Sequence, residues 1–238
     1  MSKKILIVGG VAGGASVAAR ARRLDEDARI IIFERGQHVS FSNCSLPFFL
    51  SRTVKKSENL VLMNPSTFKS RYNIEVRVRN EVLSIDRAAK KITVKNMDTE
   101  EIYYETYDKL VLSPGAMPVR PMSIKGVDRE NVFTVRNVDD ICALDNYVSQ
   151  NAVKTVAVIG GGFIGIEVAE NLKKAGKDVF IVEALAQVLT PFDQDMVQII
   201  HKELHDNGVQ LYLGDGVSSI EENGIILGTG LFIESQAV

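Results

Sequence analysis

The sequence is poor in cysteine, histidine and net charge: its 238 residues include two cysteines, three histidines and no tryptophan. Two cysteines cannot form the disulfide framework of a small secreted protein, so a reducing, cytoplasmic location is expected. A formal charge of -2 favours neither nucleic acid nor an anionic membrane surface as a partner. Glycines interrupt the apolar N-terminus, and no run of about 20 apolar residues follows, so neither a signal peptide nor a membrane span is expected. His201 and His205 lack an evident third ligand, and no metal site is predicted.

The main feature that is present is an internal duplication. The segments Ile5–Gly14 and Val156–Gly165 are similar, and each opens the same order of strand, helix and strand. A hydrophobic content of 45% over this length allows one large domain or two smaller ones. We therefore predict an α/β fold with two Rossmann-like units, in residues 1–150 and 151–238, each with a parallel sheet and a β-meander.

The expected elements of the first unit are a helix at 12–24 and strands at 4–8, 30–34, 75–79, 82–85, 91–95, 101–105 and 109–113. Prolines at 114, 118 and 121 mark a connecting segment, which continues through a helix near 138–148. The second unit is expected to have helices at 163–175 and 194–206, each followed by a glycine. Its strands are expected at 155–159, 178–183, 210–213, 217–220, 224–227 and 232–234.

The second glycine turn has the complete dinucleotide-binding pattern. Gly160, Gly162 and Gly165 fit G-x-G-x-x-G between a predicted strand and a predicted helix, whose N-terminus offers unpaired N–H groups to a pyrophosphate. Glu183, eighteen residues after Gly165, suits a ribose 2′-hydroxyl and repels a 2′-phosphate, and residues 184–186 contain no arginine. The pattern favours NADH over NADPH in the second unit.

The first glycine turn is less regular, because Val11 replaces the middle glycine between Gly9 and Gly14. Glu34, twenty residues after Gly14, restores the acidic partner, so an adenine-containing cofactor is expected here as well. Because Cys44 follows this unit closely, we expect its cofactor to exchange electrons with the thiol, which suggests FAD here and NADH in the second unit. The residues alone leave that order open.

Cys44 lies in the stretch Ser40–Pro47, between the two turns. Pro47 fits the first turn of a short helix to about Leu50, which would put Cys44 at a helix N-terminus, where the dipole favours a thiolate. No second cysteine lies within ten residues, so an internal C-x-x-x-x-C disulfide is excluded and the partner sulfur would come from outside. We interpret Cys44 as a redox centre rather than a buried structural cysteine, and Cys142 as structural.

Four segments carry a specific resemblance: GGVAGG (Gly9–Gly14), SFSNCSLPFF (Ser40–Phe49), YDKLVLSPGA (Tyr107–Ala116) and GGGFIGIEVAENL (Gly160–Leu172). Together they are similar to coenzyme A-disulfide reductases and NADH-dependent persulfide reductases, which form part of the single-cysteine branch of the flavoprotein pyridine nucleotide-disulfide oxidoreductases. The resemblance implies FAD in the first domain, NAD(P)H in the second and a mixed disulfide between Cys44 and coenzyme A. It also implies a homodimer for the full-length form.

The resemblance further implies roles for individual residues. Cofactor contacts in the first unit are implied for Gly9, Val11, Ala12, Gly13, Gly14, Glu34, Arg35, Val82, Ser113 and Gly115. Those in the second unit are implied for Gly160, Gly162, Phe163, Ile164, Gly165, Glu167 and Glu183. Coenzyme A contacts are implied for Ser16, Arg20, Arg23, Ser40 and Asn43. Arg20 and Arg23 lie three apart on one helical face, which suits phosphate groups. A lysine that the family uses further along is replaced by Tyr72, beside Arg71.

Two alternatives remain. Water-forming NADH oxidases and NADH peroxidases of the same branch carry a histidine where this sequence has Ala12, so oxygen or peroxide chemistry is the less favoured interpretation.

Relatives also continue beyond Val238 into the last strand of the second sheet, a second flavin-binding segment and a dimerisation domain. We therefore expect that the chain does not turn over alone and that the Val156 sheet lacks its terminal strand, leaving backbone groups unpaired. An inert nucleotide-binding product is the second alternative. The choice between coenzyme A disulfide and a persulfide or polysulfide as substrate stays open.

Overall fold

A computed structural model of the chain describes residues 2–150 and 152–238. The chain forms two compact units, the first comprising the chain up to Ser42 with residues 58–116, and the second comprising residues 43–57 and 117–238. The predicted boundary between residues 150 and 151 does not coincide with this division, and residue 151 lies outside the described residues. In this division, the stretch that holds Cys44 and the connecting segment from residue 117 onward both belong to the second unit.

The first unit is built on a four-stranded parallel sheet in the order β3-β2-β1-β7. Its strands are β1 (Lys4–Val8), β2 (Arg29–Glu34), β3 (Glu75–Val78) and β7 (Lys109–Leu112). β1 and β2 are almost continuous apolar runs, as expected for strands that are covered on both faces of a parallel sheet.

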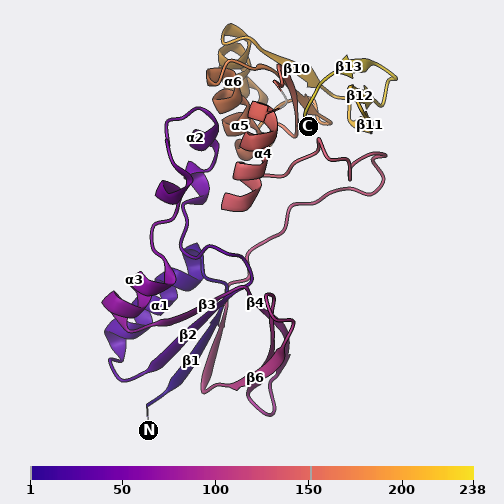
Figure 1. Cartoon of the computed structure of the whole chain (residues 1–238). Coiled ribbons are helices and arrows are strands. Elements are labelled where there is room, and N and C mark those ends of the chain that lie inside the picture. The colour runs from indigo at the N-terminus through magenta and orange to yellow at the C-terminus, as the bar shows by residue number, and fades with distance from the viewer. Residues whose placement is uncertain (1, 151) are drawn as a thin grey trace. The chain divides into compact units, whose positions relative to one another are not determined.

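Helices α1 (Ala12–Leu24) and α3 (Pro65–Tyr72) cover one face of this sheet, and an antiparallel meander covers the other (Figure 1). The meander consists of β4 (Asn80–Asp86), β5 (Lys91–Asn96) and β6 (Ile102–Thr106). Successive side chains of a strand point to opposite faces, and this alternation separates two cores. The helix side contains Ile7, Ile30, Ile32, Ala15, Ala18 and Phe68. The meander side contains Leu6, Ile31, Phe33, Ile92 and Val94. Each fully buried large apolar side chain contributes about 1.5–3 kcal/mol.

Helix α3 is not among the predicted elements, although its ends carry clear signals. The Asn64 side chain accepts the N–H of Thr67 at 2.9 Å, Pro65 occupies the first helical position, and Asn73 ends the helix with φ +48°. Of its side chains only Phe68 is buried, so no apolar periodicity marks the helix. A 3-10 helix at Ser57–Leu60 is likewise unpredicted.

The second unit repeats this architecture. Its parallel sheet has the order β10-β9-β8, with β8 (Thr155–Ile159), β9 (Asp178–Glu183) and β10 (Val209–Leu213). Helix α5 (Phe163–Lys174) packs on β8 and β9, and α6 (Gln194–Asp206) packs on β10. Helix α4 (Val138–Gln150) precedes β8. Among the described residues, no helix is long and apolar enough to cross a membrane.

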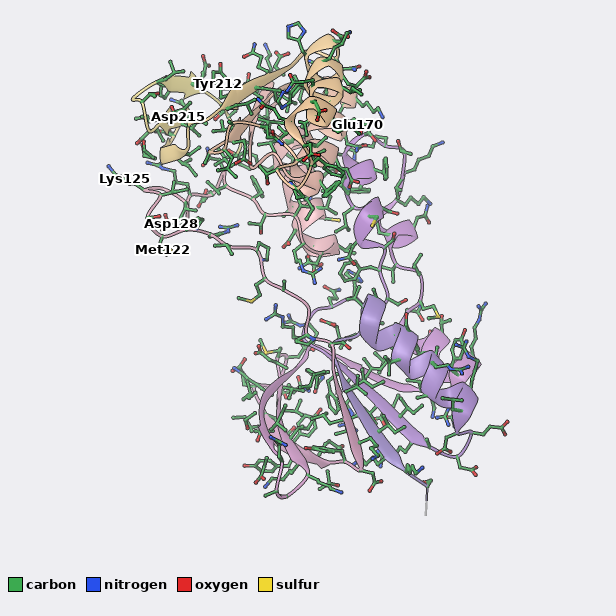
Figure 2. All side chains as sticks on the ribbon, turned by 180° about the vertical axis from the view of Figure 1, so that it is seen from behind. Met122, Lys125, Asp128, Glu170, Tyr212 and Asp215 are labelled. Atoms are coloured by element: carbon green, nitrogen blue, oxygen red, sulfur yellow. The ribbon has the colours of Figure 1, made fainter. Side chains whose placement is uncertain are left out.

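A second meander of β11 (Val217–Glu221), β12 (Gly224–Leu227) and β13 (Phe232–Glu234) packs against the sheet of the second unit. The shared core consists of Ala157, Phe180, Val182, Ile220, Ile225 and Leu227. The connecting segment runs beside β11, since the N–H of Ile220 donates to the carbonyl of Lys125 at 2.7 Å. Met122, Lys125 and Asp128 of this segment are labelled in Figure 2.

The end of the chain differs from the expected unpaired edge. Ala237 forms a parallel bridge with Val156, and the N–H of Ala157 donates to the Ala237 carbonyl at 2.9 Å. The N–H of Gln236 donates to Thr155 at 3.0 Å. The expectation of unpaired backbone groups is therefore wrong for the first residues of β8.

Candidate functional site

The two glycine turns have matching backbone geometry. The N–H of Gly9 donates to Phe33, and the N–H of Gly160 donates to Val182, both at 2.8 Å. Gly9 has φ +92° and Gly160 has φ +104°, in the region that favours glycine. In each unit, the first strand therefore leaves the sheet through the same tight turn, at the carboxyl end of the strand where open α/β sheets bind ligands.

The last glycine of each turn is required by close packing. A Cβ atom on Gly14 would lie 1.8 Å from the carbonyl oxygen of Gly9, and one on Gly165 would lie 2.0 Å from that of Gly160. Any side chain would push the helix away from the strand that precedes it. The glycines at these positions hold the N-termini of α1 and α5 against their strands.

The acidic residue of each motif is bound to its own turn. One carboxylate oxygen of Glu34 accepts the N–H of Gly10 at 2.8 Å, and one of Glu183 accepts the N–H of Gly161 at 2.8 Å. The other oxygen accepts, in both cases at 2.9 Å, the backbone N–H two residues further along the chain. These charge-assisted bonds fix the carboxylates beside the turns and leave acceptor capacity for a ligand hydroxyl.

The duplication extends to residues outside both motifs. The N–H of Ser40 donates to Gly10 at 2.9 Å, and that of Leu189 donates to Gly161 at 2.8 Å. Ser40 and Leu189 have φ values of +50° and +47°. Ser40, for which a coenzyme A contact is predicted, is buried, so its backbone supports the first turn. Leu189 is a matching support that the sequence motif does not include.

The N-termini of α1 and α5 are free to bind an anion. Neither helix has a side-chain cap or an acidic residue in its first turn. By contrast, α3 is capped by Asn64, and α4 and α6 begin with aspartates. A Cβ added to Gly160 or Gly162 would meet nothing within 4 Å, so there is open space above the second turn. Unpaired N–H groups facing open space suit the pyrophosphate of a dinucleotide.

Most other predicted residues of the first unit gather at its turn. Val11 and Ala12 form the start of α1, and a Cβ on Gly13 would lie 3.4 Å from the Ser113 hydroxyl. Ser113 follows β7 and donates its N–H to Val8 at 2.7 Å. Gly115 and Arg35 are exposed. Val82 is different, because its side chain on β4 packs against the meander-side core.

In the second unit, exposed aromatic side chains lie beside the turn. Phe163 and Ile164 begin α5 and are exposed, and Glu167 follows one turn later. The Phe163 ring meets Phe192 edge-to-face, with ring centroids 6.0 Å apart. Phe192 was not predicted, and no sequence motif marks it. Gly160, Gly162 and Phe163 also line an apolar cavity of about 620 Å³.

Cys44 is exposed and lies in a 3-10 helix at Asn43–Ser45. The predicted short helix is present as α2 (Pro47–Leu50), but its N-cap is Leu46. Cys44 therefore lies in the turn that directly precedes the helix, two residues before its N-cap. Cys142 is partly buried on α4.

The residues predicted to bind coenzyme A are divided between the units. Ser16, Arg20 and Arg23 are exposed on α1 in the first unit, whereas Asn43 belongs to the second. Neither Arg20 nor Arg23 has a carboxylate partner in the part of the chain that the structure describes. Arg22 between them is structural, because its guanidinium donates to the carbonyls of Tyr72 at 2.8 Å and Asn73 at 3.0 Å.

No cluster of three or more potential metal ligands occurs within residues 2–150 and 152–238. The Nε2 atom of His201 accepts the backbone N–H of Val188 at 3.3 Å. This ring nitrogen supports the loop that follows β9. His205 is exposed.

The comparisons agree with this architecture. The chain is 37% identical over 229 residues to a coenzyme A disulfide reductase of Staphylococcus haemolyticus, covering 96% of this chain and 51% of that protein. The solved structure of reduced Bacillus anthracis CoADR-RHD is 42% identical with a TM-score of 0.96, covering all of this chain and 43% of that one. The solved structure of a NAD-dependent persulfide reductase from A. fulgidus is 28% identical with a TM-score of 0.94, covering 99% of this chain and 45% of that one. The chain spans about half the length of the curated relatives it matches. Residues 3–237 match the family model, and the chain belongs to the pyridine nucleotide-disulphide oxidoreductases.

Proposed function

We propose that this chain is the dinucleotide-binding part of an NADH-dependent flavoprotein that reduces coenzyme A disulfide or a related persulfide or polysulfide at Cys44. The observation that carries the proposal is the presence, in one chain, of two matched dinucleotide turns and an exposed cysteine. The relatives named coenzyme A disulfide reductase and NAD-dependent persulfide reductase support the substrate class. A cytoplasmic location and a homodimer of the longer form belong to the same proposal.

FAD is assigned to the first turn and NADH to the second. The backbone N–H groups at the start of α1 and α5 would hold the two pyrophosphates. Glu34 and Glu183, fixed by their bonds to Gly10 and Gly161, would each accept a ribose hydroxyl. A bound flavin would supply the means to pass a pair of electrons from a nicotinamide to sulfur.

NADH is proposed to bind more tightly than NADPH. The Glu183 carboxylate cannot turn away from a 2′-phosphate without losing its bonds to the backbone N–H groups of Gly161 and Leu185. The next three residues carry no cation to compensate. Titrating the chain with the two nucleotides measures the ratio of dissociation constants, and equal affinity would contradict this assignment.

At Cys44 we propose a thiol–disulfide exchange. The thiolate attacks one sulfur of the substrate disulfide, the S–S bond breaks, one thiol leaves with a proton, and the other half stays bound as a mixed disulfide. Two electrons from NADH and one more proton then release the second thiol. Cys44 is exposed, which gives an external disulfide access to its sulfur.

The mixed disulfide gives a direct test that does not need turnover. The chain is incubated with coenzyme A disulfide, and the mass of the intact protein is measured. One coenzyme A adduct is expected on the parent chain and on Cys142→Ser, and none on Cys44→Ser. An adduct that survives Cys44→Ser would refute the assignment. If no adduct forms and FAD added to the chain is not retained, the chain is an inert product.

Arg20 and Arg23 are proposed to bind phosphate groups of coenzyme A through charge-assisted contacts. The double variant Arg20→Ala/Arg23→Ala should slow adduct formation with coenzyme A disulfide but not with a small uncharged disulfide. Arg87→Ala/Lys90→Ala removes the same charge from the exposed turn between β4 and β5 and serves as the control. Equal slowing by both double variants would show only a general effect of net charge.

A further inference from the structure

The stretch that carries Cys44 is fixed to the second unit by two adjacent polar residues. The Ser51 hydroxyl, directly after α2, donates to the Asn171 Oδ1 on α5 at 2.7 Å. Arg52 forms an ion pair with Asp145 on α4 at 2.8 Å. Helix α2 packs against both α4 and α5 (Figure 1). Neither contact belongs to the glycine turns or to the proposed substrate contacts.

Asn171 is unusual for its position, because it is a fully buried polar side chain in the last turn of α5. Its Nδ2 donates to the carbonyl of Glu167 on the preceding turn at 2.8 Å, which orients the Oδ1 toward Ser51. If Ser51 moved away, the buried Oδ1 atom would be left without a hydrogen bond, at a cost larger than the net gain from forming one. The Ser51 contact therefore favours the position of α2 in which the Oδ1 atom of Asn171 has a donor.

The neighbouring contact is also held in a defined geometry. Arg52 has φ +62°, which is uncommon for a residue with a side chain, and its guanidinium lies 5.5 Å from the centre of the Phe49 ring. The same group donates to the Phe49 carbonyl at 3.1 Å. Asp145 is largely buried, with 13% of its side chain exposed. The ion pair is therefore less open to screening than one between two surface side chains.

We propose that Ser51 and Asn171 are positioning residues that hold the Cys44 stretch on the nucleotide-binding unit, with Arg52 and Asp145 as a second attachment. The inference rests on the proposed role of Cys44 for its functional meaning. The positioning itself can be measured without any turnover. Failure of the positioning proposal can therefore be distinguished from failure of the proposed function.

The test uses hydrogen exchange of residues 46–54, read by peptide mass spectrometry. Ser51→Ala should accelerate exchange by about 5- to 10-fold, because the buried Oδ1 atom of Asn171 loses its donor. Ser51→Thr keeps the hydroxyl and should restore the parent rate. Ser57→Ala removes a hydroxyl from the same stretch, outside this contact, and should not change the rate.

Asn171→Leu tests the other side of the pair. Combined with Ser51→Ala, it should add little to either single variant, since both remove the same interaction. If Asn171→Leu does not fold, Ser51→Ala and Ser51→Thr still decide the question. Unchanged exchange in Ser51→Ala would overturn the proposal. Failure of Ser51→Thr to restore the rate would also overturn it, because packing rather than the hydroxyl would then hold the stretch. If exchange responds but coenzyme A adducts form equally on Cys44→Ser, positioning stands and the proposed function falls.

Discussion

Replacing Glu183 with glutamine tests whether the acidic residues of the two motifs stabilise the turns as well as select a nucleotide. The carboxylate accepts two backbone N–H groups, from Gly161 at 2.8 Å and Leu185 at 2.9 Å. A glutamine side chain has the same shape but only one acceptor oxygen, so its NH2 group would face a backbone N–H donor. Glu183→Gln is thus expected to be destabilising even without any nucleotide.

The magnitude follows from the bonds that change. One hydrogen bond to a charged acceptor is lost, worth about 1.5–3 kcal/mol, and the remaining bond becomes neutral. If local opening exposes the amides of β8 and β9, this corresponds to exchange about 10- to 150-fold faster in their peptides. Peptide-resolved hydrogen exchange is the suitable assay, because it reports on each unit separately. The chain contains no tryptophan whose fluorescence would follow unfolding.

The internal duplication supplies matched controls. Glu34→Gln should accelerate exchange in the first unit and leave the second unchanged, because Glu34 binds only its own turn. Glu170, which is labelled in Figure 2, carries an exposed carboxylate on α5 that pairs with Lys174. Glu170→Gln should change stability by only about 0.3–0.5 kcal/mol. If Glu183→Gln behaves like Glu170→Gln, the bonds at the turn do not stabilise it and the reasoning fails.

Two further predictions concern the core of each unit. Burial alone would raise the pKa of Glu105, but hydrogen bonds from Lys4 and Arg77 outweigh it and hold that pKa below its usual value. Glu105→Gln should therefore lower stability at neutral pH, with the difference from the parent shrinking as the pH falls below about 4.3, measured by urea unfolding across pH. Gly165→Ala should destabilise the second unit by about 1–3 kcal/mol or more through a backbone clash, whereas Gly162→Ala, with open space around its Cβ, should leave unfolding unchanged. Equal midpoints for the two alanine variants would show that the turn adapts.

Most of the fold could be predicted from the sequence because the pattern of apolar residues in a strand reflects how its faces are covered. Strands that are buried on both faces are almost entirely apolar, whereas strands with one exposed face alternate apolar and polar residues. The predicted strand at 82–85 corresponds to β4 at Asn80–Asp86, and the predicted helix at 138–148 to α4 at Val138–Gln150. The fold class was confirmed by the structural relatives. Helix α3 was missed because it buries little, and Leu189 and Phe192 were missed because their roles depend on the turn of the loop after β9.

The position of Cys44 shows why local patterns do not determine which unit a segment joins. Its sequence neighbours suggested a stretch that belongs with the first turn, and the short helix after it was predicted correctly. One of the contacts that join it to the second unit links Ser51 to Asn171, 120 residues away, and no periodicity connects two such positions. Asn171 carried the only available signal, since an asparagine in an otherwise apolar helix face needs a buried partner. That partner lies seven residues after the cysteine, so the same side chain that satisfies the nucleotide-binding helix also restrains the stretch that carries the thiol.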